Sequence, residues 1–184
     1  MNFLLHFYLT HFLSDYPFQS GKLVKLKMER YLGVFLHTGV HLLTMLVILS
    51  PLLHDRRVWG SIALVYITHN FIDQAKVALN RAKPKYAKLY YFIDQFLHWG
   101  IIYAAARMAG DVTPALSGRW LELYTNQDIF LFLLVLVLAT YFYDVTRYFA
   151  TGTFKKKDFK RDYKTMLRNA LIVALAFGIY WWAY

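Results

Sequence analysis

Long apolar runs divide the sequence and leave little room for a water-soluble core. Hydropathy predicts six runs, with boundaries good to a few residues: 2–16, 31–53, 58–79, 86–109, 128–148 and 167–184. Most approach the roughly 20 residues that a helix needs to cross the hydrocarbon core of a bilayer. None alternates polar and apolar residues with a period of two, as the strands of a membrane barrel do. The pattern predicts an all-α polytopic membrane protein with about six transmembrane helices.

Composition agrees with this fold class. Of the 184 residues, 58% are hydrophobic, 19% aromatic and 17% charged, whereas soluble domains carry roughly a quarter charged residues. Cysteine is absent, which excludes disulfides, a thiolate nucleophile and cysteine metal sites. The first run lacks the basic stretch and small-residue cleavage site of a signal peptide, so we expect it to be retained.

We predict a single integral membrane domain over residues 1–184. Residues 1–109 form a four-helix core that carries histidines and aspartates, and residues 110–127 form an extracytoplasmic loop. Residues 128–184 add two further helices joined by a basic cytoplasmic loop. The segment 22–30 interleaves apolar and basic residues, which fits either a helix lying on an anionic leaflet or a solvated connector.

The distribution of basic residues predicts how the chain is oriented. Lys and Arg number 21 against 11 Asp and Glu, giving a formal net charge of +10. The segments 22–30, 76–88 and 147–168 hold all the basic residues except four: Arg56, Arg57, Arg107 and Arg119. With six spans, the two sets fall on opposite sides of the membrane. The positive-inside rule then places the basic loops in the cytoplasm and both termini outside, so the high net charge needs no nucleic-acid partner.

Ionisable residues recur within the first four apolar runs as pairs with i, i+4 spacing. This spacing places both side chains on one face of a helix, and inside a membrane such residues are costly unless they are partnered. By the predicted orientation, all four pairs lie at similar depth in the cytoplasmic half of the first four helices. We therefore expect them to form one cluster: His11/Asp15, His37/His41, His69/Asp73 and Asp94/His98.

Five imidazoles and three carboxylates together indicate a divalent metal. Transition metals favour this ligand mixture, with zinc as the first choice and manganese or iron as alternatives. Eight candidate ligands suit one or two ions, and a carboxylate outside the metal shell can act as a general base. Asp15, Asp73 and Asp94 are the candidates for that catalytic role. A proton or cation relay and a purely structural polar core are the alternative interpretations.

The four pairs lie in stretches that resemble a known family. These stretches are HFLSDYPFQ (11–19), LHTGVH (36–41), THNFID (68–73) and FIDQFLH (92–98). They are similar to a family of small bacterial membrane proteins catalogued as domain of unknown function 3307, typified by His-x-x-x-Asp-x-x-x-Gln. The resemblance covers residues 1–105 and implies a multi-pass protein of the bacterial inner (cytoplasmic) membrane. A more distant similarity to membrane-bound metal-dependent hydrolases implies a metal and a hydrolytic reaction.

These observations predict a membrane-embedded metal-binding protein that hydrolyses a lipid-like ester or phosphoester. The signatures of P-loop proteins, zincin proteases and serine hydrolases are missing from the sequence. The alternative function is a transporter, or a membrane subunit that binds a proton or cation at the His/Asp cluster. The expected partners are membrane lipids and a lipid-like substrate or ion, with a homo-oligomer or an energising subunit as further possibilities.

Overall fold

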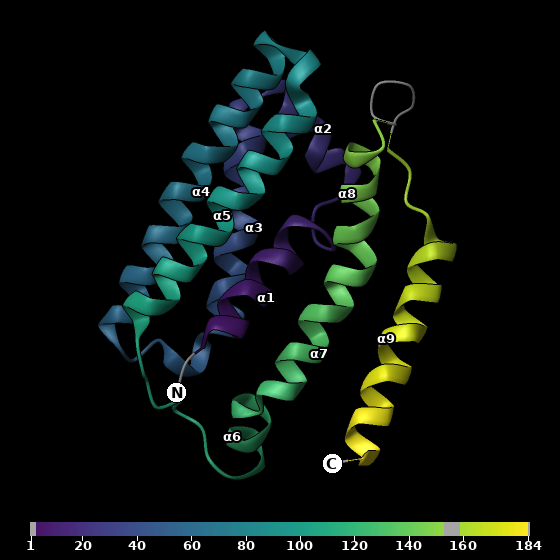
Figure 1. Cartoon of the computed structure of the whole chain (residues 1–184). Coiled ribbons are helices and arrows are strands. Elements are labelled where there is room, and N and C mark those ends of the chain that lie inside the picture. Colours follow the sequence, from purple (N-terminus) through teal and green to yellow (C-terminus); the bar gives the residue numbers. More distant parts are fainter. Residues whose placement is uncertain (1–2, 153–158, 184) are drawn as a thin grey trace.

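The computed structural model describes residues 3–152 and 159–183, and all regular structure in these ranges is helical (Figure 1). The predicted all-α class is therefore confirmed. The long elements are α1 (Leu4–Asp15), α2 (Gly21–Glu29), α3 (Tyr31–Ile48), α4 (Arg56–Ala82), α5 (Ala87–Ala109), α6 (Gly118–Thr125), α7 (Gln127–Val137), α8 (Tyr143–Ala150) and α9 (Tyr163–Ala183). Short elements are the 3₁₀ turns η1 (Ser50–Leu52) and η2 (Pro84–Tyr86) and the π turn η3 (Leu138–Phe142).

Local side chains determine where several helices begin. The side chains of Ser20, Asp55 and Asn126 accept hydrogen bonds from backbone N–H groups in the first turns of α2, α4 and α7. Such caps satisfy donors that have no partner inside the helix. Pro51 is the second residue of η1 and Pro84 the first of η2, positions in the first turn where a missing N–H costs little. These turns reverse the chain between α3 and α4 and between α4 and α5.

The short helix α1 lies at the centre of the bundle. It contacts α3, α5 and α7, and α4 and α5 form a long hairpin beside α3 (Figure 1). Seven of its twelve residues are buried, including His6, His11 and Ser14. Twelve residues span only about 18 Å, well below the hydrocarbon thickness of roughly 30 Å. Neighbouring helices therefore surround α1 and shield its polar residues.

Helix α2 packs unusually close to the start of α3. A Cβ atom added at Gly33 would lie 2.3 Å from the carbonyl carbon of Leu26 and from the backbone nitrogen of Lys27. Only glycine fits at that distance. The absence of a side chain at Gly33 thus brings the backbone of α2 against α3, where one face of α2 covers the interior of the bundle.

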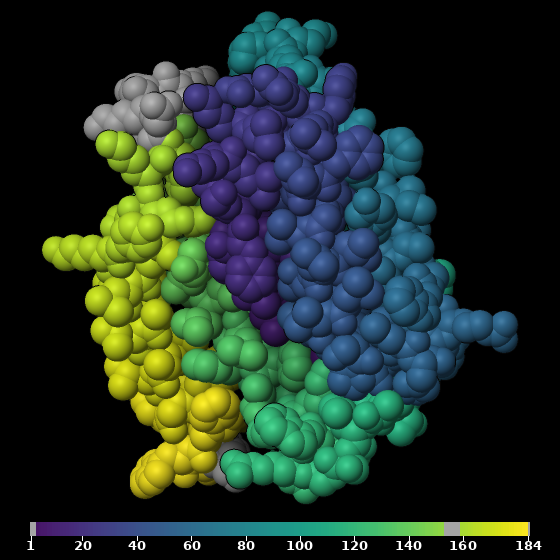
Figure 2. Space-filling model, turned by 180° about the vertical axis from the view of Figure 1, so that it is seen from behind, coloured from purple at the N-terminus to yellow at the C-terminus, as the bar shows by residue number. Residues whose placement is uncertain are grey.

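A single π turn joins α7 and α8 into one rod, with α9 alongside. A π turn changes the backbone hydrogen-bond pattern locally, and the amide of Asn169 on α9 donates to the carbonyl of Ala139 in η3 at 2.7 Å. Aromatic side chains also pack between α7 and α9, where the ring centroids of Phe132 on α7 and Phe177 on α9 are 5.1 Å apart. Figure 2 shows α9 as an outer column beside α7.

Three helical segments are long and apolar enough to cross a membrane: Tyr31–Ile48, Gln127–Ala150 and Tyr163–Ala183. The chain thus has the character of a membrane protein, with three candidate spans in the described residues where six were predicted. The first predicted span coincides with α1, whose 12 residues are fewer than the 18 that define these candidates. Helices α4 and α5 are long enough, but the polar residues of the expected cluster, His69, Asp73, Asp94 and His98, lower their apolarity.

The two ends of the bundle differ in charge. Figure 1 places the start of α1, α6 and the end of α9 at one end, and α2, the α4–α5 turn and the end of α8 at the other. The segments predicted to be basic loops therefore gather at a single end. Residues 153–158, which include Lys155, Lys156 and Lys157 of the third segment, lie outside the described residues. The predicted loop 110–127 differs from expectation by containing α6.

Candidate metal centre

Five histidine rings from four helices meet in the interior of the bundle. His41 and His69 lie 3.8 Å apart between ring centroids, His69 and His98 lie 4.2 Å apart, and His11 and His98 lie 5.2 Å apart. His37 lies 4.7 Å from His41, and no more than 2% of any of the five residues is exposed. The predicted convergence of the four pairs is confirmed.

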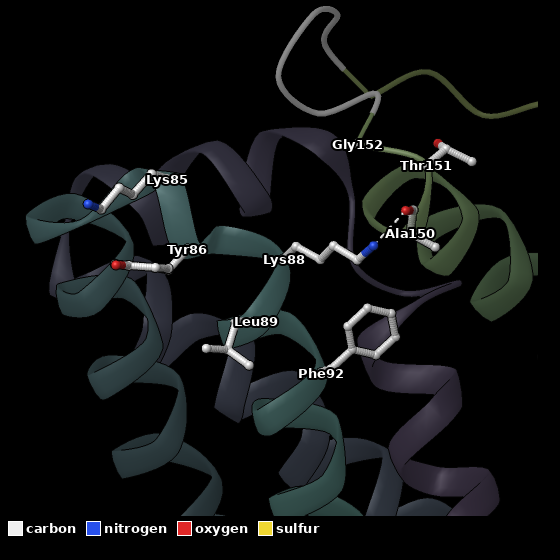
Figure 3. A pocket seen from close by; sticks show the side chains of 8 residues that line it. All are labelled: Lys85, Tyr86, Lys88, Leu89, Phe92, Ala150, Thr151 and Gly152. Atoms are coloured by element: carbon white, nitrogen blue, oxygen red, sulfur yellow. Dashed lines mark hydrogen bonds between the residues drawn. The ribbon is translucent and has the colours of Figure 1, made fainter.

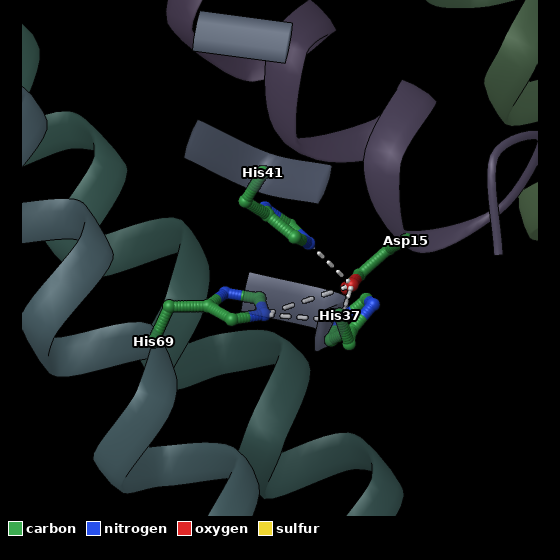
Figure 4. Close-up of side chains that lie close together, drawn as sticks. All are labelled: Asp15, His37, His41 and His69. Atoms are coloured by element: carbon green, nitrogen blue, oxygen red, sulfur yellow. Dashed lines mark hydrogen bonds and ion pairs between the residues drawn. The ribbon is translucent and has the colours of Figure 1, made fainter. Parts of the chain in front are cut away.

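Asp15 is the focus of the tightest part of this cluster (Figure 4). Its Oδ1 atom lies 3.0 Å from Nε2 of His37, 3.0 Å from Nε2 of His41 and 3.8 Å from Nε2 of His69. The two Nε2 atoms of His37 and His69 are 3.2 Å apart. We call these four residues the Asp15 group; their ligand atoms all lie within 4.8 Å of one another.

These separations match those between ligands that share a metal ion. A tetrahedral ion bound to imidazole nitrogens at about 2.0–2.1 Å holds neighbouring ligand atoms about 3.3 Å apart. In the Asp15 group the three distances from Oδ1 of Asp15 to the Nε2 atoms lie between 3.0 and 3.8 Å. The three rings present the same nitrogen, Nε2, toward one carboxylate oxygen, so small side-chain adjustments would suffice to surround an ion.

A second set of ligands, which we call the Asp73 group, comprises His69, Asp73 and His98. Oδ2 of Asp73 lies 3.3 Å from Nε2 of His37 and 3.4 Å from Nε2 of His69. The same oxygen accepts a hydrogen bond from Nζ of Lys27 at 2.6 Å. The two groups therefore share His69. Their carboxylates differ, because Asp73 is paired with the ammonium group of Lys27 and Asp15 is not paired with a lysine in the described residues.

Asp94 and His11, two of the eight predicted ligands, lie beside these groups rather than in them. Oδ2 of Asp94 accepts a hydrogen bond from Nζ of Lys76 at 2.6 Å. His11 lies 3.4 Å from Oδ2 of Asp15 through Nε2. The predicted set thus divides into six residues with metal-like spacing and two that flank them.

The backbone orients His98 for ligation. Its Nδ1–H donates to the carbonyl oxygen of Asp94 at 2.8 Å, which leaves the lone pair on Nε2. Among the described residues, Nε2 of His98 and Nδ1 of His69 are buried without a hydrogen-bond partner. A hydrogen bond on the outer nitrogen is the usual arrangement around a metal-bound histidine, so the bare Nε2 of His98 favours a ligand role, whereas at His69 the bare Nδ1 is the nitrogen that faces away from the Asp15 group.

A family model described as a protein of unknown function, DUF3307, matches residues 3–127. The chain belongs to this family. The match contains α1 to α6 and all eight predicted site residues, and it ends at the first residue of α7. No curated protein and no solved structure matches the chain.

Within the matched DUF3307 segment, several polar residues support the cluster that the pairs alone did not identify. The Gln19 amide lies 2.9 Å from Nδ1 of His37, and Asn70 donates to the hydroxyl of Thr38 at 3.0 Å. The sequence predicts Lys27 and Lys76 only as residues of the basic loops, whereas in the structure each donates to a buried carboxylate of the cluster. Both lie near the ends of predicted apolar runs, so no local pattern distinguishes them from lysines in solvent.

A surface groove lies outside the cluster. Its volume is about 530 Å³, and it lies between the start of α5 and the end of α8. Lys88 points across it and donates to the carbonyl of Ala150 at 2.8 Å (Figure 3). None of the eight predicted site residues lines this groove, so the buried cluster remains the candidate functional site.

Proposed function

We propose that this protein is a membrane-embedded metal protein that hydrolyses a lipid-like ester or phosphoester. The observation that supports it most strongly is the spacing of the Asp15 group, in which three Nε2 atoms surround one carboxylate oxygen at 3.0 to 3.8 Å. A buried polar core without a metal would need to satisfy its own nitrogens, whereas several ring nitrogens here have no hydrogen-bond partner among the described residues.

Asp15, His37, His41 and His69 would hold the ion, with zinc as the first choice and manganese or iron as alternatives. The bound ion would polarise the scissile group and lower the pKa of its water. The protein contributes a dry interior, since His37, His41 and His69 are at most 1% exposed. Gln19 orients His37 from outside the metal shell.

Asp73 is the candidate catalytic carboxylate that lies nearest to the Asp15 group without belonging to it, and as a general base it would have to exchange its contact with Lys27 for one with the attacking water. Its Oδ2 lies 3.3 Å from Nε2 of His37, directly beside the Asp15 group but outside it. Asp15 itself belongs to the ligand set, and Asp94 is held away by Lys76. We assign Asp94 to the positioning of His98 through its backbone carbonyl.

The substrate class follows from the surroundings of the cluster. Three helical segments are suited to a bilayer, and α2, which covers the cluster, exposes Val24 and Met28. An amphiphile in the adjacent leaflet would meet these side chains first. We place the basic end of the bundle in the cytoplasm and both termini outside, in a bacterial inner membrane, with the exposed apolar faces of α4 and α5, which include Phe71 and Phe96, toward lipid.

The alternative function, a proton or cation relay in a transporter, is favoured by one observation. A chain of hydrogen bonds runs from Asp94 through Gln95 and Tyr16 to Tyr91 and Thr146 on α8, with separations of 2.8 to 3.2 Å. An amide at Gln95 interrupts proton hopping, because it exchanges protons far less readily than a hydroxyl or carboxyl group. This chain therefore suits positioning better than proton transfer.

Metal content and hydrolysis of the purified protein test the proposal together. After loading with zinc, manganese or iron and removal of free metal, we expect stoichiometric ion in the wild type and loss of that ion in Asp15→Asn. Asp128→Asn, which removes an aspartate from the first turn of α7, is the matched control and should retain the ion.

Hydrolysis is measured on short-chain ester and phosphoester lipids in mixed micelles. We expect chelation to stop the reaction and added metal to restore it. Wild-type protein that binds none of the three metals would overturn the metal centre, and metal-loaded protein inactive on both lipid classes would favour the transporter.

A further inference from the structure

The two central carboxylates of the cluster have different neighbours. Asp15 faces imidazoles, with His37, His41 and His69 near Oδ1 and His11 near Oδ2. No lysine or arginine in the described ranges forms an ion pair with it. A carboxylate surrounded only by imidazoles is free to bind a cation.

Asp73, by contrast, already has a cation at each oxygen. Nζ of Lys27 lies 2.6 Å from Oδ2, and Nζ of Lys76 lies 3.4 Å from Oδ1. Lys76 also contacts Oδ2 of Asp94 at 2.6 Å. A metal ion bound at the Asp73 group would need an oxygen that an ammonium group now occupies.

Lys27 reaches this position because the backbone of α2 is fixed. The Lys27 side chain is 9% exposed, whereas that of Lys25 on the same helix is 78% exposed. The close approach of α2 to Gly33 involves the backbone of Lys27 itself. Burying an ammonium group is costly without a paired carboxylate, so this geometry is a built feature of the site.

We propose that Lys27 is an internal cation that limits the cluster to one metal ion. The inference rests on the proposed metal function and assigns the ion to the Asp15 group. Lys27 takes the place that a second ion would occupy beside Asp73. The site is then a mononuclear centre with a lysine-held carboxylate next to it, although its ligands are numerous enough for two ions.

The charges within the cluster support a single ion. Three aspartates and two lysines give this buried set a net charge of −1 when the imidazoles are neutral, as metal binding requires. One divalent ion changes the net charge to +1, which a bound hydroxide or an anionic substrate group can neutralise. Two ions with both lysines in place would leave +3, and uncompensated buried charge is strongly unfavourable.

Counting bound ions tests the role of Lys27. Each protein is purified in detergent, equilibrated with excess zinc, freed of loosely bound metal and analysed for its elemental content. We expect one ion per chain in the wild type and two in Lys27→Met, because Asp15, His37 and His41 can hold one ion while the shared His69, with Asp73 and His98, holds the second. Lys25→Met, which removes an exposed lysine from the same helix, is the matched control and should bind one ion.

Two further variants keep the test decisive. Lys27→Met combined with Asp73→Asn should return to one ion, since the second site loses its carboxylate. Asp73→Asn alone should bind one ion like the wild type, and this result does not depend on the folding of Lys27→Met. Circular dichroism and gel filtration establish which variants are folded.

The outcomes separate this inference from the proposed function. Two ions in the wild type, one ion in folded Lys27→Met, or none in folded Asp73→Asn would overturn the role of Lys27 while leaving a metal centre in place. No ion in the wild type would overturn the metal centre itself, and the role of Lys27 with it.

Discussion

Helices α3 and α9 are both long and apolar enough to cross a membrane, but they differ in how many of their residues are buried. Helix α3 buries seven of its 18 residues, among them His37 and His41. Helix α9 buries only Met166 and Val173 of its 21 residues. One helix turns polar side chains toward protein, and the other presents apolar side chains outward. The bundle of α1 to α5 thus shields the polar cluster from its surroundings. Helix α9, by contrast, exposes most of its apolar side chains.

The difference also shows which contacts hold each region in place. Burial of apolar surface gives little driving force between helices in lipid, so packing and hydrogen bonds decide their association. The cluster helices are joined by ion pairs, by Gly33 and by Ser61, whose hydroxyl donates to the carbonyl of Ala105 at 2.8 Å. Helix α9 has few such contacts, chiefly Asn169.

The largest expected effect comes from removing metal, which should destabilise the cluster region only. An ion present at 1,000 times its dissociation constant adds about 4 kcal/mol to stability by mass action. We expect chelation to lower the melting temperature of the wild type and to leave His37→Leu/His41→Leu unchanged. The double variant Leu171→Ala/Ile172→Ala on α9 should respond to the chelator as the wild type does. An equal response of all three proteins would contradict a metal held by α3.

Next in size is the effect of filling the contact between α2 and α3. Gly33→Ala should lower the free energy of unfolding by about 1–3 kcal/mol, the usual cost of overpacking, because its methyl group would overlap the backbone of Leu26. Gly39→Ala on the same helix meets nothing within 4 Å and should be neutral or stabilising. Denaturant titration in detergent measures both, and equal stability of the two variants would exclude the close contact as a constraint.

A smaller effect is expected where α9 meets the π turn. Asn169→Leu removes the hydrogen bond to the carbonyl of Ala139 and should cost about 1 kcal/mol. Leu175→Ala, at a side chain that is 67% exposed, serves as the control and should change stability by less than about 0.5 kcal/mol. If Leu175→Ala were the more damaging change, α9 would be held by apolar packing instead.

The smallest effect concerns the start of α9 and depends on pH. The Arg147 side chain lowers the pKa of Asp162 from 3.8 to about 2. Because the folded pKa is depressed, this ion pair stabilises the protein above pH 3.8, and its contribution disappears as the pH falls toward 2. We expect the difference in melting temperature between wild type and Arg147→Met to shrink over this interval. A difference that stays constant from pH 5 to pH 2 would exclude the ion pair as its source.

The sequence predicted the helical class and the meeting of the four pairs because both depend on short spacings. An i, i+4 pair such as His69/Asp73 fixes a face of a helix without any tertiary information. The roles of Lys27 and Lys76 could not be predicted in this way. Lys27 meets Asp73 across 46 positions of sequence, and a rule based on loop charge counts every lysine alike. Hydropathy likewise does not show that neighbouring helices surround α1.

The central place of α1 has a consequence for biogenesis. The His6 side chain donates to the backbone carbonyl of Tyr124 at 3.0 Å, and its ring stacks on Phe130 at 3.5 Å between centroids. These partners leave the ribosome more than a hundred residues after His6. At 5–20 residues per second, α1 must wait several seconds or longer for the chain that encloses it. Synthesis of α1 and its enclosure by the bundle are therefore separate events, and the enclosure is complete only after the start of α7 has been synthesised.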